Sequence, residues 1–502
     1  MSSDKVTKYK VQSIKIQNYM NDVKKAVMTN WRWVMCAMLF FATTVNYMDR
    51  QVLSLTFKEF IQPEFHWTDS DYGTITGVFS IAYAIFCLFA GKFIDWMGTK
   101  KGYLWAIIIW SLGAVLHAGC GFVTEHIVGL ESKAALLEAS GAIVSSISMV
   151  SVWLFLACRL ILGLGEAGNF PAAIKVTAEY FPKKDRAFAT ALFNAGASVG
   201  ALAAPATIPL LAKSLGWEMA FIIIGALGFI WAGIWIFVYD KPEESKHVNE
   251  AELEYIHQDE EKGQNDKVQS TKEEKQMSFA EAFKHKQTWS FAFGKFMTDG
   301  VWWFFLFWAP AYFQDQFGIK ASDPKGIALI FTLYAIVTVI SLFGGYLPKI
   351  FVEKKGMEPY AGRMRAMLIF AFFPLLALFA QPLGREMGPW AVAIIIGIVG
   401  AAHQSWSANI FSTTGDMFPK SAVATITGIG AMAGGVGSFL INKGSGVLFD
   451  YSASLGDAFA FMGFTGKEAG YMIIFCICAV AYLIGWTVMK ALVPKHEPVV
   501  VK

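Results

Sequence analysis

Residues 179–200 read EYFPKKDRAFATALFNAGASVG, and residues 416–437 read DMFPKSAVATITGIGAMAGGVG. The two stretches align without gaps, since each has an acid, then one intervening residue, then Phe-Pro-Lys, and a run of small residues that ends in Val-Gly. A second match joins LFAGKFID at residues 88–95 to LFGGYLPK at residues 342–349. The separation is 237 residues for the first match and 254 for the second, so the first copy carries 17 additional residues between these points. The chain is therefore built from two related halves.

The composition around these repeats is that of a membrane protein. Of 502 residues, 55% are hydrophobic and only 16% are charged, which lies outside the usual range of soluble proteins. The apolar residues form runs of roughly 20 residues, the length that a helix needs to cross a hydrocarbon core about 30 Å thick. We expect an all-α membrane protein with twelve spans, at residues 31–57, 72–94, 102–122, 149–180, 186–212, 217–239, 289–314, 325–352, 363–382, 388–414, 421–447 and 468–492.

The basic residues indicate the orientation of the chain in the membrane. They gather in the N-terminal tail and in alternate loops, at Lys100, Lys101, Lys183, Lys184, Arg186, Arg363 and Arg365. The intervening loops are acidic or poor in lysine, so the positive-inside rule places both termini in the cytoplasm. The expected location is the plasma (inner) membrane of a bacterium, with many passes.

A polar stretch rich in Glu, Lys and Gln separates the first six spans from the last six. Its composition predicts a partly helical cytoplasmic linker. The expected units are a cytoplasmic tail at 1–30, a six-helix bundle at 31–239, the linker at 240–288, a second six-helix bundle at 289–494 and a tail at 495–502.

Several function classes are excluded by what the sequence lacks. The net charge of +3 is close to balanced, which gives no reason to expect a nucleic-acid partner. There is no HExxH motif, no phosphate-binding loop and no nucleophile elbow. The cysteines lie in or beside apolar runs without metal-ligand spacing, at positions 36, 87, 120, 158, 476 and 478. We expect neither an enzyme nor a metal or other cofactor.

The loop GKFIDWMGTKKG joins the second and third spans and fits the pattern G-x-x-x-D-x-x-G-x-[RK], with Gly91, Asp95, Gly98 and Lys100 in register. In this it resembles the signature loop of the major facilitator superfamily. The glycines allow a tight turn, and Asp95 can lie at the positive N-terminus of a neighbouring helix and latch the two halves on the cytoplasmic side. A solvated turn with incidental charges is the alternative. The second copy has Lys349 in place of the acid.

The first span contains an acid beside a base. A charge at the centre of a membrane helix costs about 2.5 to 3.5 kcal/mol, so such residues usually face the bundle interior and serve function. Asp49 and Arg50 lie on one side of this span with Asn46, and Tyr47 flanks them. The planar fork of Arg50 suits the carboxylate of an anionic substrate. Asp49 either carries protons or only neutralises the arginine.

The fourth span has a second charged set. Arg159 and Glu166 are seven residues apart, which is two helical turns, and Asn169 follows one turn later. A carboxylate in such a place can alternate between a protonated, unpaired state and an ionised state paired with arginine. Glu166 and Arg159 are thus a candidate proton switch, and a permanent structural salt bridge is the alternative.

Two spans of the second half add candidates. In the seventh span, Lys295, Asp299 and Trp302 form one stripe, where aromatic and polar groups together suit a sugar. Alternatively, Lys295 extends to the cytoplasmic interface or pairs with Asp299 one turn on. In the tenth span, His403 and Asn409 are candidate substrate contacts, and packing is the other reading of His403.

At this level of detail the chain resembles the hexuronate transporters of the anion:cation symporter branch of the major facilitator superfamily. The resemblance depends on NYMDR, GKFIDWMGTKKG, RLILGLGEAGNFPAAIK, KFMTDGVWWFFLFWAPAYF and AAHQSWSANIFSTTGDMFPK, in this order. It implies proton-driven uptake of glucuronate or galacturonate by alternating access. It also implies carboxylate binding by Arg50, substrate contacts by Tyr47, Tyr83 and Lys295, and proton coupling by Asp49, Glu166 and Arg159.

The expected partners are a small anionic sugar acid, protons and the lipid bilayer, and the expected state is a monomer. An aldonate or another organic anion, or exchange of organic phosphates, are the alternatives for the substrate and the reaction. The long loop near residues 123–148 and the lysine-rich N-terminal tail have no role that the sequence assigns.

Overall fold

The computed structural model describes residues 28–266, 277–341, 344 and 346–499, so most of the predicted N-terminal tail lies outside the described residues. The helices of the first half are α2 (Trp31–Thr56), η1 (Phe57–Ile61), α3 (Gln62–Phe65), α4 (Asp69–Met97), α5 (Thr99–Leu116), η2 (His117–Gly119), α6 (Cys120–Val128), α7 (Lys133–Leu137), α8 (Ile143–Glu166), α9 (Asn169–Tyr180), α10 (Lys183–Leu215) and α11 (Trp217–Val238).

Helix α12 (Glu250–Asp266) follows in the linker. The second half contains α13 (Phe279–Ala282), α14 (Lys286–Phe317), α15 (Pro324–Ser341), α16 (Tyr346–Lys355), α17 (Pro359–Phe372), η3 (Phe373–Phe379), α18 (Ala380–Met387), α19 (Pro389–Met417), α20 (Lys420–Leu455), η4 (Gly456–Ala458), the antiparallel strands β1 (Ala460–Phe461) and β2 (Phe464–Thr465), and α21 (Gly466–Leu492).

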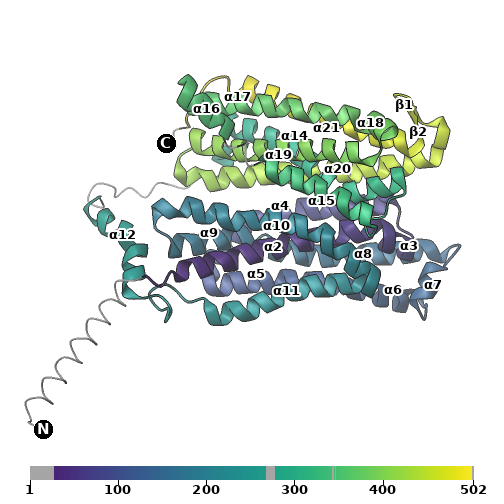
Figure 1. Cartoon of the computed structure of the whole chain (residues 1–502), viewed down its shortest axis with the longest axis horizontal. Helices are drawn as coiled ribbons and strands as arrows, with labels where there is room; N and C mark the ends of the chain where they lie inside the picture. The colour runs from purple at the N-terminus through teal and green to yellow at the C-terminus, as the bar shows by residue number, and fades with distance from the viewer. Residues whose placement is uncertain (1–27, 267–276, 342–343, 345, 500–502) are drawn as a thin grey trace, which may run out of the picture.

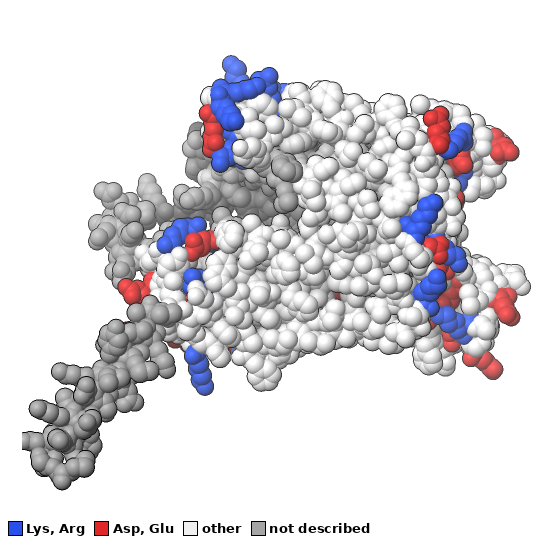
Figure 2. Space-filling view, viewed as in Figure 1, with Lys and Arg blue, Asp and Glu red and all other residues white. Residues whose placement is uncertain are grey.

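The long helices form two bundles that lie side by side (Figure 1). Helices α2 to α11 make one bundle, and α14 to α21 make the other. We call the end where α2 begins and α21 ends the terminal end, and the opposite end, with α3, α7 and the two strands, the far end. Charged side chains gather at these two ends, and the long belt between them is almost free of charge (Figure 2). This is the surface that a bilayer requires of a spanning protein.

Ten helices of the described chain are long and apolar enough to cross a membrane. Two more long helices, α2 and α14, fall short of that group although they run through the bundles beside it (Figure 1). Their low apolarity has a simple cause, because α2 contains Asp49 and Arg50, and α14 contains Lys295 and Asp299. The two helices that are too polar for an isolated span are those that carry the predicted site residues.

The internal repeat corresponds to equivalent packing in the two bundles. Helix α10 lies against α2, where a side chain at Gly200 would approach the carbonyl of Thr44 to 2.3 Å. Helix α20 lies against α14 in the same way, where a side chain at Gly437 would approach the carbonyl of Phe296 to 2.1 Å. These glycines are 237 residues apart, the separation found in the sequence repeat. Glycine is needed at both because the backbones touch.

The linker helix α12 is fixed to the terminal end of the first bundle. The buried carboxylate of Glu252 accepts hydrogen bonds from the backbone N–H groups of Trp31 and Arg32, at 2.9 and 3.1 Å. It also pairs with the Arg32 guanidinium at 3.0 Å. Glu252 therefore caps the start of α2, where backbone N–H groups have no partner within the helix.

The long loop before α8 covers the far end of the first bundle. Lys133 of α7 pairs with Glu64 of α3 at 2.9 Å and with Glu218 of α11 at 2.5 Å. The ring of His66 hydrogen-bonds the carbonyl of Leu136 at 2.8 Å. The loop near residues 123–148, to which the sequence assigns no role, thus holds α3 against the first bundle.

Candidate functional site

The candidate site lies about midway along α4 and α14, near the last turns of α2 and at the end of α8, where α9 follows. Its centre is Arg50, whose guanidinium is bound by Glu166 of α8. Nη2 of Arg50 lies 2.7 Å from Oε2 of Glu166, and Nε lies 3.1 Å from the same oxygen. Both side chains are almost fully enclosed, with 7% and 0% of their surface exposed. The pair is a strong one, because both partners are charged and water is largely excluded.

Three aromatic rings surround the Arg50 guanidinium. Its central carbon lies 4.6 Å from the ring centre of Tyr83, 5.2 Å from that of Trp303 and 5.4 Å from that of Tyr47. These are cation–π distances. Trp303 belongs to α14 and the other two rings to the first bundle, so Arg50 lies where the two bundles meet. All three rings keep part of their surface accessible, whereas Arg50 is buried.

The second acid and the second base, Asp49 and Arg159, are buried with hydrogen-bonding atoms that have no partner among the described residues. Neither carboxylate oxygen of Asp49 has a hydrogen-bond partner among the described residues, and the same is true of Nη1 and Nη2 of Arg159. Asp49 is 2% exposed and Arg159 is 2% exposed. Oε1 of Glu166 and both amide atoms of Asn46 are likewise unpaired. A buried polar group without a hydrogen-bond partner is costly, so this region of α2 and α8 is not fully satisfied in this conformation.

The sequence interpretation of Glu166 is corrected in one respect. It pairs Glu166 with Arg159 on the same helix, but the observed partner is Arg50 on α2. In this structure no ion pair or hydrogen bond joins Arg159 to Glu166, or Asp49 to Arg50. Spacing along α8 shows which residues share a face, and it contains no information on which helix is packed against that face.

The candidates in α14 and α19 are mostly paired with each other. Lys295 forms an ion pair with Asp299 at 2.7 Å, as one of the two alternative readings predicts. The ring of His403 stacks on Trp302, with centres 5.4 Å apart and planes 2° apart. Nδ1 of His403 also lies 2.7 Å from the Tyr482 hydroxyl. These contacts are what the alternative interpretation of His403, as a packing residue, predicts.

Asn409 lies one turn and a half further along α19, towards the terminal end. Its amide donates to the carbonyls of Ser405 at 2.8 Å and of Gly344 at 3.5 Å. It also lines a pocket of about 380 Å³ with Lys349 and Arg363, and neither Arg50 nor any aromatic residue around Arg50 lines this pocket. The structure therefore separates Asn409 from the residues around Arg50.

The signature loop forms the turn between α4 and α5 at the terminal end. Gly98 has φ +78°, a conformation that glycine adopts readily. Asp95 pairs with Lys175 of α9 at 2.7 Å, and Lys100 pairs with Asp240 at 2.8 Å. Lys175 belongs to the first bundle and Asp240 is the first residue of the linker, so in this conformation neither of these pairs joins the loop to the second bundle.

Trp303 is the site residue that the sequence interpretation missed. The helical stripe that contains Lys295 predicts Trp302 as the substrate contact, but its neighbour Trp303 is the residue that contacts Arg50. Adjacent helical residues point about 100° apart. The doublet WW was the available signal, but only the rotation of α14 against the first bundle decides which ring reaches Arg50.

In the part of the chain that the structure describes, polar contacts between the bundles lie at the far end. Among the described residues, the hydrogen bonds and ion pairs that join 31–239 to 289–494 all involve residues 58–74 of the first half. Near Arg50 the contacts across the interface are aromatic, and include Phe79 and Tyr83 against Trp303. The two bundles are thus fastened at the far end.

Comparisons with known proteins agree with this architecture. The chain is 28% identical over 465 residues to the "Hexuronate transporter" of Escherichia coli strain K12, covering 91% of this chain and 94% of the relative. It is 28% identical over 355 residues to the "Galacturonate transporter" of Dickeya chrysanthemi, covering 70% and 92%. It is also 28% identical over 326 residues to the "D-galactonate transporter" of an Escherichia coli O6:H1 strain, covering 64% and 68%. These matches confirm the resemblance to hexuronate transporters.

Solved structures show the same fold. The crystal structure of the D-xylose-proton symporter matches with a TM-score of 0.64 at 14% identity, covering 93% of this chain and 98% of that one. A bacterial homologue of the human lysosomal transporter Spinster matches with a TM-score of 0.62 at 18% identity, covering 92% and 97%. The family model described as "Major Facilitator Superfamily" matches residues 39–441, which is most of the chain. The fold and the family expected from the sequence are confirmed: the chain is a transporter, not an enzyme, and belongs to the major facilitator superfamily.

Proposed function

We propose that this protein is a proton-coupled symporter that imports hexuronates such as glucuronate and galacturonate by alternating access. The observation that carries the proposal is the buried pair of Arg50 and Glu166 at the junction of the two bundles. The names of the relatives support transport of an organic anion, and sugar acids are the class they share. Proton coupling and the roles of single residues are inferences from the geometry.

Arg50 is the residue that we assign to the substrate carboxylate. A guanidinium has a planar set of donors that can hold one carboxylate in a two-point fork. In this structure Glu166 takes up that fork through Nε and Nη2. A substrate carboxylate therefore competes with Glu166 for the same donors.

This competition supplies a mechanism for coupling. A proton on Glu166 removes its charge and weakens its hold on Arg50, so that the fork becomes available to the substrate. The substrate anion and the proton then bind together, as symport requires. Loss of the proton restores the pair of Arg50 and Glu166 and favours release of the anion. Binding of the two ligands is thus linked through one arginine.

Asp49 and Arg159 are the second pair that we assign to this cycle. Both carboxylate oxygens of Asp49 and both Nη atoms of Arg159 have no hydrogen-bond partner among the residues that the structure describes, and both residues are buried near Glu166. When Glu166 is neutral, Arg159 is the remaining buried cation of α8, and Asp49 is the carboxylate that can balance it. We propose that Asp49 is the second group through which a proton passes.

The aromatic rings suit the sugar part of the substrate. Tyr47, Tyr83 and Trp303 present ring faces beside the carboxylate clamp, and apolar faces of a pyranose pack well against such rings. Lys295 and Asp299 on α14 offer a cation and an acceptor that a hydroxyl-rich ligand can share. We assign Trp302 and His403, whose rings stack on each other, a supporting role next to these residues.

The conformation is assigned from the contacts between the bundles. The positive-inside rule puts the terminal end in the cytoplasm, so the far end is the outer end. Because the polar contacts between the bundles lie at the far end, we assign this structure to the inward-facing side of the cycle. The signature loop, with Gly91, Asp95, Gly98 and Lys100, would then form contacts between the bundles only when the molecule faces outward.

The test is uptake by purified protein in lipid vesicles with an imposed proton gradient. Glucuronate, galacturonate, galactonate and an organic phosphate are offered in turn. Uphill accumulation of the two hexuronates, abolished by a proton ionophore, is the expected result. Preference for galactonate would favour the second candidate, an aldonate transporter, to which the galactonate-transporting relative points. Uptake that needs a phosphate ester inside the vesicles would contradict the proposal.

A further inference from the structure

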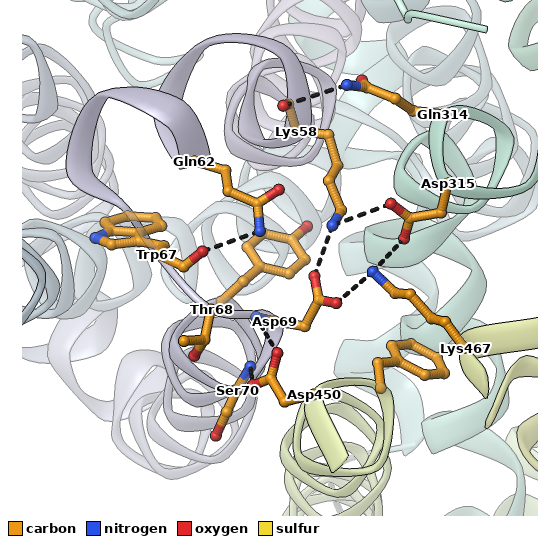
Figure 3. Close-up of polar contacts among 12 residues, drawn as sticks. Lys58, Gln62, Trp67, Thr68, Asp69, Ser70, Gln314, Asp315, Asp450 and Lys467 are labelled. Carbon is orange, nitrogen blue, oxygen red and sulfur yellow. Dashed lines mark hydrogen bonds and ion pairs between the residues drawn. The ribbon is translucent and has the colours of Figure 1, made fainter. Parts of the chain in front are cut away.

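Four charged residues form a closed ring at the far end, where the bundles meet (Figure 3). Lys58 of η1 and Asp69 of α4 come from the first bundle. Asp315 of α14 and Lys467 of α21 come from the second. Lysines and aspartates alternate around the ring, and each side chain contacts one partner in its own bundle and one in the other (Figure 3).

All four contacts lie within ion-pair distance. Within the bundles, Nζ of Lys58 lies 2.7 Å from Oδ1 of Asp69, and Nζ of Lys467 lies 2.6 Å from Oδ2 of Asp315. Between the bundles, Nζ of Lys58 lies 3.1 Å from Oδ1 of Asp315, and Lys467 contacts Oδ2 of Asp69. The side chains are between 5% and 21% exposed, so they are shielded from water in this state.

This pattern decides what happens when the bundles part. Separation at the far end breaks the two ion pairs between the bundles and keeps the two pairs within them. Each bundle then exposes one complete pair of a lysine and an aspartate, and no charge is left alone. Breaking a buried pair is usually costly because one charge stays behind without a partner. The ring avoids that penalty, so it can hold the far end closed and still release it.

Neighbouring contacts act at the same seam. Asp450 of α20 accepts hydrogen bonds from the N–H groups of Asp69 and Ser70, at 2.9 and 2.7 Å, and so caps the first turn of α4 from the other bundle (Figure 3). Lys443 of α20 donates to the hydroxyls of Ser70 and Thr74, both at 2.7 Å. The sequence predicts an acid that caps a helix across the two halves at the terminal end, through Asp95. The structure has such a cap at the opposite end of the same helix.

We propose that Lys58, Asp69, Asp315 and Lys467 form the outer gate of the transport cycle, a ring that closes by pairing across the bundles and opens by retaining one pair in each. This inference deepens the proposed alternating-access function. It rests on that function for the assignment of the far end to the outer side of the membrane. It is independent of which anion is carried, because none of the four residues contacts Arg50 or the three aromatic side chains that surround Arg50.

A charge exchange confined to one bundle tests the ring. Lys58→Asp combined with Asp69→Lys keeps a pair within the first bundle but sets like charges against Asp315 and Lys467. Asp315→Lys combined with Lys467→Asp does the same from the other side. All four substitutions together restore every attraction. The fourfold variant carries the substitutions of both double variants. If it folds and behaves like the parent, misfolding caused by any one substitution does not explain the effect of a double variant.

The readout is the rate at which a cysteine below the gate is labelled. Phe307→Cys is a suitable reporter in a background without the six native cysteines, because Phe307 is buried between the gate and the site and contacts Phe79 across the seam. A membrane-impermeant maleimide is applied to intact cells from outside, without substrate. Either paired exchange is expected to raise the labelling rate about tenfold or more, since like charges repel across the closed gate. The fourfold variant is expected to return it to the original rate.

A single neutralisation acts in the opposite direction. Asp315→Asn leaves Lys467 with Asp69 as its only partner in the ring, so opening would strand a lysine. Labelling of the same reporter is expected to become slower than in the parent. The gate assignment is overturned if the paired exchanges leave the labelling rate unchanged, or if the fourfold variant is no closer to the parent than either pair.

The same variants separate this inference from the proposed function. Labelling needs no substrate, so it reports on the gate even if no hexuronate is carried. If labelling follows the pattern above and hexuronate uptake is absent from the parent protein, the gate stands and the proposed substrate is wrong. If uptake is present and labelling ignores the charge exchanges, the gate assignment fails alone.

Discussion

Arg50 and Glu166 lie 116 residues apart in the chain, and their side chains meet at 2.7 Å inside the first bundle. This relationship joins the two charged sets that the sequence shows separately, one on the first span and one on the fourth. A single guanidinium then faces a protein carboxylate and, in the proposed cycle, a substrate carboxylate. The predictions below follow from that competition and from the contacts that position it.

Arg50→Lys is expected to weaken substrate binding. An ammonium group cannot reproduce the two-point fork, and a hydrogen bond to a charged group contributes about 1.5–3 kcal/mol, which corresponds to roughly 10- to 100-fold in affinity. The half-saturating substrate concentration for exchange in vesicles measures this. Arg385→Lys, on an exposed arginine paired with Glu468 at the far end, is the control and should leave that concentration unchanged. Equal behaviour of the two variants would remove Arg50 from the binding role.

Trp303→Leu and Trp302→Leu are expected to differ. Trp303 contacts the Arg50 guanidinium, so its loss should weaken apparent affinity for the sugar acid by about 30-fold, in line with a buried cation–π contact of about 2 kcal/mol. Trp302 stacks on His403, so its loss should lower the melting temperature and leave affinity nearly intact. Binding isotherms and thermal unfolding of the two variants provide the comparison. The reverse pattern would return the substrate role to Trp302.

Glu252→Gln is expected to destabilise the protein by about 3–5 kcal/mol, the usual effect of breaking a buried ion pair. Its carboxylate caps α2 and pairs with Arg32, and the amide would leave that guanidinium without a counter-charge. Glu254→Gln changes an exposed residue of the same helix and serves as the control. A large drop in melting temperature for the first variant alone is predicted. Similar melting temperatures would show that α12 is not fixed in this way.

The C-terminal segment is expected to loosen as pH rises. Both ring nitrogens of His496 face acceptors, the carbonyl of Asp416 at 2.9 Å and the carboxylate of Glu358. The hydrogen bond to Asp416 and the nearby Glu358 raise the pKa of His496 above its ordinary value of about 6.5. A raised pKa means that the contact is fully stabilising below that ordinary value and is lost as pH climbs through the raised one.

Limited proteolysis of residues 494–499 across this pH range measures the effect. Cleavage should accelerate towards alkaline pH in the parent protein. His496→Gln should cleave quickly at every pH, because the amide cannot donate from two opposite sides of a ring. A parent profile that is flat with pH would rule out His496 as the fastening group.

The fold could be predicted largely from the sequence because its determinants are local. Apolar runs of membrane length and the matched pair of small-residue helices sufficed for the superfamily architecture. The polar helices α2 and α14 were also identified, since charge in an apolar run is visible without a structure. The candidate site needed more. The partner of Glu166, and the choice of Trp303 over Trp302, depend on how helices are rotated against each other, which no single helix encodes.

The ion-pair ring at the far end could not be predicted from the sequence either. Lys58, Asp69, Asp315 and Lys467 lie at helix ends, where charged residues are ordinary and give no signal in sequence. They acquire meaning only because two bundles bring four separate segments together (Figure 3). Long-range pairing of this kind is the part of a transporter that must be read from its structure.

The most direct test of the central claim is transport by Glu166→Gln, measured in two modes in the same vesicles. The amide imitates a protonated Glu166, so the Arg50 fork is free at every pH and the link to the proton is cut. Exchange of labelled for unlabelled hexuronate should persist, and accumulation driven by a proton gradient should vanish. If the variant still concentrates hexuronate against its gradient, Glu166 does not couple the proton to the anion and the proposed competition for Arg50 is wrong.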